Sequence, residues 1–245
     1  MTDHLDPVVR TRGLTVGYSG TAAAVISDLD IVGGLVWHVT GSNGSGKTAL
    51  LKTLAGLLRP VFGHVEGRGG MGPGGAIYVH SVPYLFAGTV RRNLTLVHPH
   101  PTDVQAVAEA FGLTALLDRQ ATKLSHGQQR RLALARALVG RPSLLLVDEP
   151  EGGLDDEAIA AWRACAVRAV QAGTPALVVA AHRPLAFDGI RGREVRLSEY
   201  VARPGEDEEG GAPSLPVSPG HRTARSRDSD LFAPVETHTH LIDPA

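Results

Sequence analysis

Short apolar runs alternate along the chain with stretches whose apolar residues recur every three or four positions. The first kind of segment is typical of β-strands and the second of amphipathic helices. Residues 144–147 and 176–181 are continuous apolar runs, as expected for parallel strands that are buried on both faces of a sheet. Residues 36–40 and 76–79 are shorter strand candidates. The pattern therefore predicts an α/β fold whose core is a mostly parallel sheet.

The first forty residues indicate β structure of another kind. Residues 8–11 and 14–16 are β-prone, Gly13 separates them, and Gly17 follows the second segment. Because glycine favours turns, we expect short strands broken by turns here. The sequence predicts an antiparallel β layer that precedes the parallel core.

The middle of the chain is dominated by helical spacing. Thr89 is a predicted N-cap for residues 90–96, and a helix that starts at Asp103 is expected to end at Gly112. Together with the helical stretch that follows, these segments predict a small α-helical subdomain, inserted in the α/β body at about residues 87–140.

The composition changes near residue 202. An acidic run at 206–209 is followed by a stretch rich in proline, serine and glycine, which predicts a disordered tail over residues 202–245. We therefore expect one folded domain over residues 1–201. Residues 194–197 are predicted to form its final edge strand.

Composition and charge exclude several classes of protein. The net charge is −1, so no broad basic surface for nucleic acid is expected. A single cysteine, Cys165, excludes an internal disulfide; it and Trp162 lie in a helical stretch, and both are expected in the core. No apolar run approaches the roughly 18 residues of a membrane-spanning helix, and no signal peptide is evident. We expect a cytoplasmic protein.

Residues 41–48 carry the first chemical signal, the pattern G-x-x-x-x-G-K-[ST] between a predicted strand and a predicted helix of residues 50–58. In this pattern backbone N–H groups wrap the phosphates of a nucleotide, the lysine neutralises the β- and γ-phosphate oxygens, and the hydroxyl can bind Mg²⁺. The predicted nucleotide-binding residues are Gly41, Ser42, Asn43, Gly44, Ser45, Gly46, Lys47 and Thr48.

Three further segments carry candidate chemistry. Asp148 and Glu149 follow a buried strand, at the end of the sheet where open α/β folds place their sites. His182 follows the next apolar strand. Residues 124–128, Leu-Ser-His-Gly-Gln, precede a helix that Ser125 can cap, and its free N–H groups would bind an anion.

In this order the motifs resemble the nucleotide-binding subunit of an ABC transporter, over roughly residues 8–200. The pentapeptide at 124–128 is the specific part, since many other NTPases share the phosphate loop but lack this signature. The resemblance implies an ATPase of the P-loop NTPase fold that uses ATP and Mg²⁺. It also implies a role for each matching residue.

Around the chain's own nucleotide, Tyr18 would stack on adenine and Asp148 would hold the metal directly or through water. Glu149 would be the general base, and His182 would contact the γ-phosphate, with Lys47 as the third catalytic residue. Hydrolysis would need a second cassette, whose nucleotide would meet the signature and the interface residue of this chain. These residues are Ser125, Gly127, Gln128 and Asp155.

One departure from the family pattern affects the metal site. Ser81 stands where the family has a glutamine that ligates Mg²⁺ and reports the nucleotide state to the membrane partner. Serine is shorter, so we expect a bridging water between Ser81 and the metal. Hydrolysis is still expected, with altered coupling.

The resemblance further implies a separately encoded membrane subunit, which would hold this chain on the inner face of the membrane. Residues 83–94 are similar to the segment of exporter cassettes that meets the membrane domain, which favours export over import. A soluble ABC ATPase that acts in translation or on DNA is one alternative. A cassette with weak ATPase activity, because of Ser81, is another. The sequence does not identify the cargo.

Overall fold

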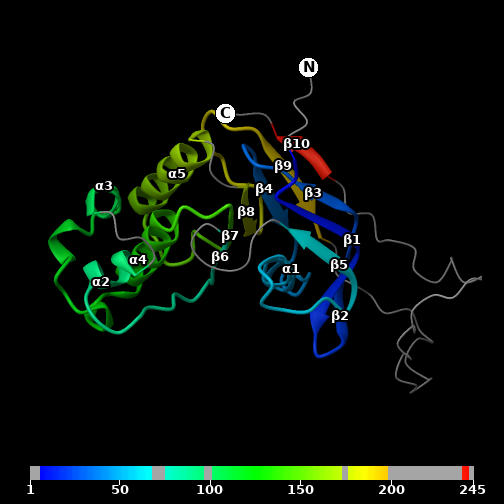
Figure 1. The fold of residues 1–245 in the computed structure, drawn as a ribbon, viewed down its shortest axis with the longest axis horizontal. Coiled ribbons are helices and arrows are strands. Elements are labelled where there is room, and N and C mark those ends of the chain that lie inside the picture. Colours follow the sequence, from blue (N-terminus) through cyan, green and yellow to red (C-terminus); the bar gives the residue numbers. More distant parts are fainter. Residues whose placement is uncertain (1–5, 68–74, 97–100, 173–175, 198–238, 243–245) are drawn as a thin grey trace, which may run out of the picture.

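A parallel sheet and a smaller antiparallel sheet share helix α1 (Lys47–Leu54) and one apolar core (Figure 1). The computed structural model describes residues 6–67, 75–96, 101–172, 176–197 and 239–242. The parallel sheet has the strand order β10-β9-β4-β8-β7-β6, and the smaller sheet joins β2, β3 and β5 to β1. The strands are β1 Val9–Tyr18, β2 Thr21–Ile26, β3 Leu29–Ile31, β4 Val36–Thr40, β5 Phe62–Gly67, β6 Ala76–Val79, β7 Leu144–Asp148, β8 Ala176–Ala181, β9 Gly192–Arg196 and β10 Thr239–Ile242.

The central strands of the parallel sheet are buried on both faces, as the continuous apolar runs predict. In β7, Leu144 and Leu146 belong to the core that contains α1, while Leu145 and Val147 belong to the core on the other side. Successive side chains of a strand point to opposite faces, so one apolar run serves two cores. Strands β4, β8, β7 and β6 pair in parallel and end at the same edge of the sheet.

The antiparallel layer differs from prediction in one respect. Residues 9–18 form one continuous strand, β1, rather than two strands broken at Gly13. Gly13 takes a left-handed conformation (φ 55°) inside the strand, and its N–H donates to Asp28 Oδ1 at 2.8 Å. The glycine thus bends β1 without ending it, and β1 reaches β2, β3 and β5.

The remaining helices lie on the far side of the parallel sheet from α1 (Figure 1). They bury Trp162, whose ring meets Phe187 edge to face with centroids 5.4 Å apart, and Cys165 is also buried. Both core predictions are confirmed. The helices are α2 Val90–Thr95, α3 Pro101–Ala110, α4 His126–Val139 and α5 Asp156–Gln171, with short 3-10 turns η1 Thr114–Leu116 and η2 Ala121–Lys123.

Helix boundaries agree with the predicted caps except at two ends. Thr89 caps α2, as predicted, by accepting from the N–H of Arg92. Helix α1 stops at Leu54 rather than continuing to residue 58, because Gly56 adopts φ 73° and turns the chain. Helix α3 begins at Pro101, two residues before the predicted start, since proline suits the first helical turn.

The C-terminal part of the chain corrects two predictions. Residues 239–242 lie within the predicted disordered tail, yet they form β10, antiparallel to β9. Consequently β9 is not the edge strand that residues 194–197 were expected to form, but lies between β10 and β4. Thr239 and Ile242 are β-branched, which suits a strand, and β9 offers the segment backbone groups with which to pair. The rest of the predicted tail, 202–238 and 243–245, lies outside the described residues.

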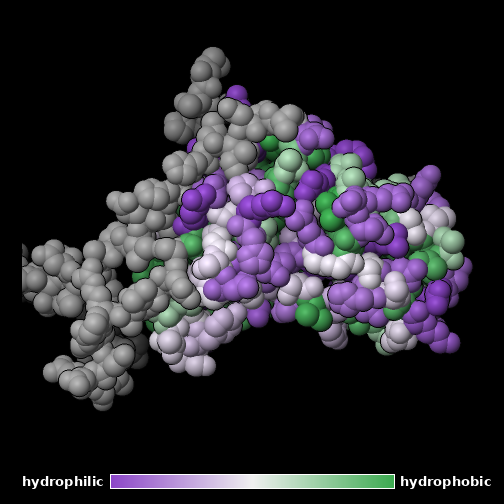
Figure 2. All heavy atoms as spheres, turned by 180° about the vertical axis from the view of Figure 1, so that it is seen from behind, coloured by the Kyte–Doolittle hydropathy of each residue, from purple (hydrophilic) through white to green (hydrophobic). Residues whose placement is uncertain are grey.

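The surface fits the composition of the chain. Figure 2 shows a face on which polar side chains predominate and apolar ones form small separate groups. Among the described helices, none combines the length and the apolar character needed to cross a membrane.

Candidate functional site

The loop at residues 41–46 joins β4 to α1, so the strand–loop–helix context of the nucleotide pattern is present. Two glycines in it have no room for a side chain. A Cβ at Gly41 (φ 154°) would lie 2.5 Å from Leu197 O, and one at Gly46 (φ 89°) would lie 2.9 Å from Ala24 Cβ. Only glycine therefore allows this loop to pack against its neighbours at these two positions.

Lys47 is held by the loop itself. Its Nζ donates to the backbone oxygens of Gly41 and Ser42, each at 2.8 Å, and the residue is only 6 % exposed. Among the described residues this buried ammonium donates to carbonyl oxygens rather than to a carboxylate, so its charge is available to a phosphate.

Asp148, at the end of β7, meets the start of α1. Its Oδ2 accepts from Thr48 Oγ1 at 2.8 Å and from the Tyr78 hydroxyl at 3.0 Å. Burial first, and then the charge of Asp148, raise the pKa of Tyr78 well above its usual value, so the phenol keeps its proton and donates it. A carboxylate beside a hydroxyl is the set of hard oxygen ligands that Mg²⁺ prefers, so these residues fit the metal.

Glu149 and His182 lie next to this site, at the ends of β7 and β8. Glu149 Oε1 is 3.9 Å from His182 Nε2, and the two side chains are 44 % and 60 % exposed. The Glu149 backbone is left-handed, with φ 46°, and its N–H donates to Ala180 O at 2.9 Å. The structure thus brings together Lys47, Asp148, Glu149 and His182, which the sequence predicts as one site.

The end of a third strand, β6, is connected to the site by a buried arginine. Arg130, on α4, donates to the carbonyl oxygens of Asp148 at 2.7 Å and Glu149 at 2.8 Å, and also to that of His80 after β6. Arg130 is completely buried. It therefore connects the helix of the signature to the ends of two adjacent strands.

Tyr18 lies at the end of β1 with its side chain toward solvent. It is 46 % exposed, and Lys52 Nζ of α1 lies 5.6 Å from the centre of its ring. The ring therefore sits beside the helix that follows the phosphate loop, with open surface of the kind on which a base can stack.

The signature residues form the start of α4. Ser125 Oγ accepts from the N–H of Gln128, and Gln128 Oε1 accepts from the N–H of Ser125, which makes a capping box. The predicted cap is confirmed, and the Gln128 side chain serves it. Gly127 packs so closely that a Cβ there would lie 3.1 Å from Gly153 O. Asp155 caps α5 through the N–H of Ala158 at 2.8 Å.

Ser81 follows β6, and the structure leaves its metal role a prediction. The hydroxyl lies 3.3 Å from His80 Nδ1, which also accepts from the N–H of Val82 at 2.9 Å. Because Nδ1 accepts a backbone N–H, a neutral His80 carries its proton on Nε2. Within the described part of the chain, the Ser81 side chain thus contacts this histidine.

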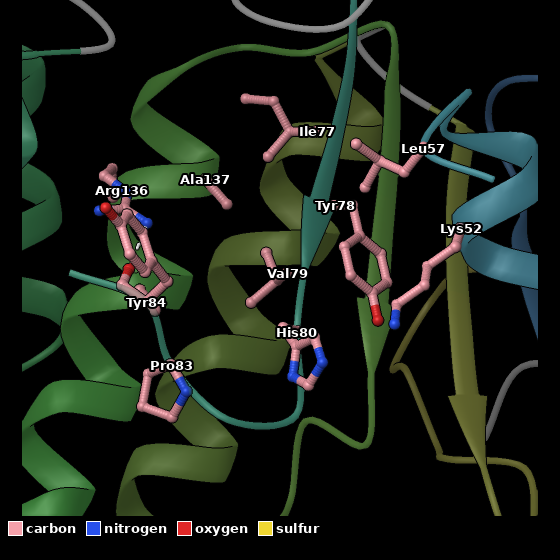
Figure 3. A pocket seen from close by; sticks show the side chains of 11 residues that line it. Lys52, Leu57, Ile77, Tyr78, Val79, His80, Pro83, Tyr84, Arg136 and Ala137 are labelled. Carbon is pink, nitrogen blue, oxygen red and sulfur yellow. Dashed lines mark hydrogen bonds between the residues drawn. The ribbon is translucent and has the colours of Figure 1, made fainter. Parts of the chain in front are cut away.

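A groove of about 350 Å³ runs between α1, β6 and α4 (Figure 3). Figure 3 shows Tyr84 and Arg136 on one side of it and Tyr78 and Lys52 on the other. The Tyr84 side chain is 70 % exposed. Most of the lining is apolar, and none of the 11 lining residues is acidic.

Sequence reasoning did not find Tyr78 and Arg130. For Tyr78 the sequence shows only that it lies in a predicted strand, since the neighbourhood of β6 and β7 comes from the structure. For Arg130 a signal existed. Arg130 shares a helical face with Ala133, Leu134 and Ala137, all buried, so spacing alone places its charge inside the protein. A charge at such a position needs polar partners, and here they are backbone oxygens.

Comparison with known proteins points to one family. The profile of the family described as "ABC transporter" matches residues 26–152. The cytochrome c biogenesis ATP-binding export protein CcmA of Rhodobacter capsulatus is 40 % identical over 197 residues, which are 79 % of this chain and 88 % of that protein. The zinc import ATP-binding protein ZnuC of Ruegeria pomeroyi is 34 % identical over 194 residues, or 75 % of this chain and 76 % of that protein.

A solved structure of an ATP-binding subunit of an ABC transporter has the same fold, with a TM-score of 0.66 at 21 % identity, over 78 % of this chain and 85 % of that one. The motif order, the family profile and these relatives agree. The chain belongs to the ABC transporter family, as an ATP-binding subunit of the kind that hydrolyses ATP to power transport.

Proposed function

We propose that this chain binds Mg²⁺ and ATP, hydrolyses the nucleotide with a second cassette, and powers a separately encoded membrane subunit. One observation carries the proposal: the phosphate loop, the Asp148–Glu149 pair and His182 meet at one edge of the parallel sheet. Phosphoryl transfer depends on positioning and on charge neutralisation, and this edge supplies both.

Each residue has a distinct task in the proposed reaction. Lys47 exchanges its two carbonyl partners for oxygens of the β- and γ-phosphates. Thr48 and Asp148 would hold Mg²⁺, which would neutralise phosphate charge when bound, with Ser81 as a further, water-mediated contact. Glu149 orients the attacking water and accepts its proton. His182, which lies 3.9 Å from Glu149, hydrogen-bonds to the γ-phosphate and to that water.

A second cassette completes the proposed site. The capped N-terminus of α4 presents backbone N–H groups and the positive end of a helix dipole, which suit the γ-phosphate of the opposite subunit. Ser125 and Gly127 are the proposed contacts, Gln128 supports them through the capping box, and Asp155 lies at the interface. Tyr18 stacks on the adenine of the chain's own ATP.

The groove between α1, β6 and α4 is the proposed seat of the membrane subunit. Its apolar lining, with Lys52 and Arg136 at its sides and no acidic residue, suits an amphipathic helix with an acidic side chain. Docking would hold this chain on the inner face of the membrane. We propose export as the direction, on the resemblance of residues 83–94 to exporter cassettes; relatives named for export and for import both match the chain.

The test compares ATP turnover of the wild type, Glu149→Gln and Ser81→Gln, with and without the membrane subunit. Glu149→Gln should lower kcat by a factor of about 100 to 1,000, because the water loses its base, while ATP still binds. Ser81→Gln should increase the stimulation of turnover by the membrane subunit. The matched control is Glu157→Gln, in the first turn of α5, which should change kcat less than about twofold. Unchanged turnover in Glu149→Gln would refute the assignment of the base.

A further inference from the structure

Arg130 is a buried cation that the proposed mechanism does not use. It is 0 % exposed, and it donates hydrogen bonds to the backbone oxygens of His80, Asp148 and Glu149. These oxygens belong to the ends of β6 and β7, which are neighbours in the parallel sheet. One guanidinium therefore fixes the start of the turn that holds Ser81 and the peptide that carries Glu149.

The Glu149 peptide needs such a partner. A non-glycine residue at φ 46° costs roughly 1 to 2 kcal/mol, so the chain keeps this conformation only where its surroundings impose it. Three hydrogen bonds do so here: the Glu149 N–H donates to Ala180 O, and the Glu149 carbonyl accepts from the Gly152 N–H at 3.2 Å and from Arg130 Nη2 at 2.8 Å. The direction of the carboxylate depends on this backbone.

Burying the charge of Arg130 costs free energy, which indicates that this residue does something other than maximise the stability of the fold. Burying a charge is costly, and the Nε of Arg130 has no hydrogen-bond partner among the described residues. Burial lowers the pKa of Arg130, against the opposing charges of Asp148 and Glu149. An apolar side chain would fill the site at lower cost, but it would remove the Arg130 donors from the carbonyl oxygens of His80, Asp148 and Glu149, of which Glu149 O would keep the Gly152 N–H at 3.2 Å.

We propose that Arg130 is a positioning residue for ATP hydrolysis. It holds the Glu149 peptide and the turn before Ser81 in a fixed position relative to the signature helix, α4. The inference rests on the proposed role of Glu149. It assigns Arg130 to the chemical step rather than to ATP binding, because its contacts are to the strand ends and not to the phosphate loop. Arginine suits this task better than lysine, since its planar fork can serve several acceptors at once.

The test measures kcat, KM and the Kd of a fluorescent ATP analogue for full-length Arg130→Gln and Arg130→Lys. We expect kcat to fall about 100-fold in Arg130→Gln and about tenfold in Arg130→Lys, with KM and Kd within about twofold of wild type. The matched control is Arg131→Gln on the same helix. Arg131 donates to Phe111 O at 3.4 Å, away from the strand ends, so kcat of this variant should stay within about twofold of wild type.

Two results would overturn the inference: a kcat within twofold of wild type in both Arg130 variants, or a Kd that rises in proportion to the loss of kcat. If Arg130→Gln does not fold, Arg130→Lys decides alone, by the same criteria. Thermal unfolding of each variant with bound analogue verifies the fold.

A double mutant separates this inference from the proposed function. If Arg130 acts through Glu149, adding Arg130→Gln to Glu149→Gln should change the residual turnover less than about twofold. Losses that multiply would show that Arg130 acts elsewhere and would overturn the inference. If Glu149→Gln alone retains full turnover, it is the assignment of the base that fails.

Discussion

Two buried cations in this protein make the same kind of contact over very different lengths of chain. Lys47 donates to carbonyl oxygens five and six residues away, inside the phosphate loop. Arg130 donates to carbonyl oxygens 18, 19 and 50 residues away, at the ends of two strands. The first contact is local and needs little more than the loop itself. The second exists only when the sheet and α4 are assembled, so the two cations should fail in different ways.

Removing the local cation should have the largest effect. Lys47→Ala takes away the charge that meets the phosphates, so we expect ATP affinity to fall at least about 100-fold and turnover about 1,000-fold. Equilibrium binding of an ATP analogue and steady-state hydrolysis measure the two losses. Lys123→Ala, outside the loop, is the control.

This result would differ from that for Arg130, whose removal should leave the affinity for ATP unchanged. The contrast fails if Lys47→Ala binds ATP with wild-type affinity, because the two cations would then both act on turnover alone.

The stability of the sheet behind the phosphate loop should depend on pH. His38 is buried in β4, the strand that leads into the loop, and burial lowers its pKa to about 4 despite the nearby charge of Glu194. The unfolded chain therefore binds more protons than the folded one between about pH 6.5 and pH 4, and stability falls as the pH falls through this window. Between pH 7 and pH 5 we expect this histidine alone to cost about 2 kcal/mol.

Urea unfolding at a series of pH values measures this loss, and His38→Gln should remove it. His64→Gln is the control, because His64 lies exposed on β5 beside Glu66. If the His38→Gln protein loses as much stability as the wild type between pH 7 and pH 5, other groups are responsible.

The smallest effect concerns Asp148 Oδ2, which accepts hydrogen bonds from both α1 and β6. Asp148 Oδ2 accepts from Thr48 of α1 and from Tyr78 of β6, so Tyr78→Phe removes the donor on the strand side only. Hydrogen bonds that orient a ligand carboxylate support metal affinity, and we expect the half-saturating Mg²⁺ concentration to rise about tenfold. Titration of ATPase activity with Mg²⁺ measures the shift.

ATP-analogue binding in the presence of a chelator is the internal control for Tyr78→Phe and should not change. A variant that needs no more Mg²⁺ than the wild type would mean that the phenol does not orient Asp148.

The sequence predicts what is encoded locally. The phosphate loop, the caps at Thr89 and Ser125, and the doubly buried strands follow from spacing and residue type, and the structure has all of them. The bend at Gly13 was expected to break a strand, because glycine alone does not tell a turn from a bend inside a paired strand.

Long-range pairing is what the sequence does not reveal. Which strand end Arg130 would reach, and that Tyr78 would share an oxygen with Thr48, depend on the order of strands in the sheet. The same holds for β10, whose four residues pair with β9, a strand more than 40 residues earlier in the chain.

Strand β10 also has a consequence for the behaviour of the protein in solution. The open edge of a sheet is a template on which a second molecule can add a strand, and this is a common route to aggregation. By pairing with Gly192–Arg196, the chain covers an edge of its own main sheet. The remote segment at 239–242 thereby moves the open edge of the sheet from β9 to the four-residue β10, and a protein cut before it would expose β9 to its neighbours.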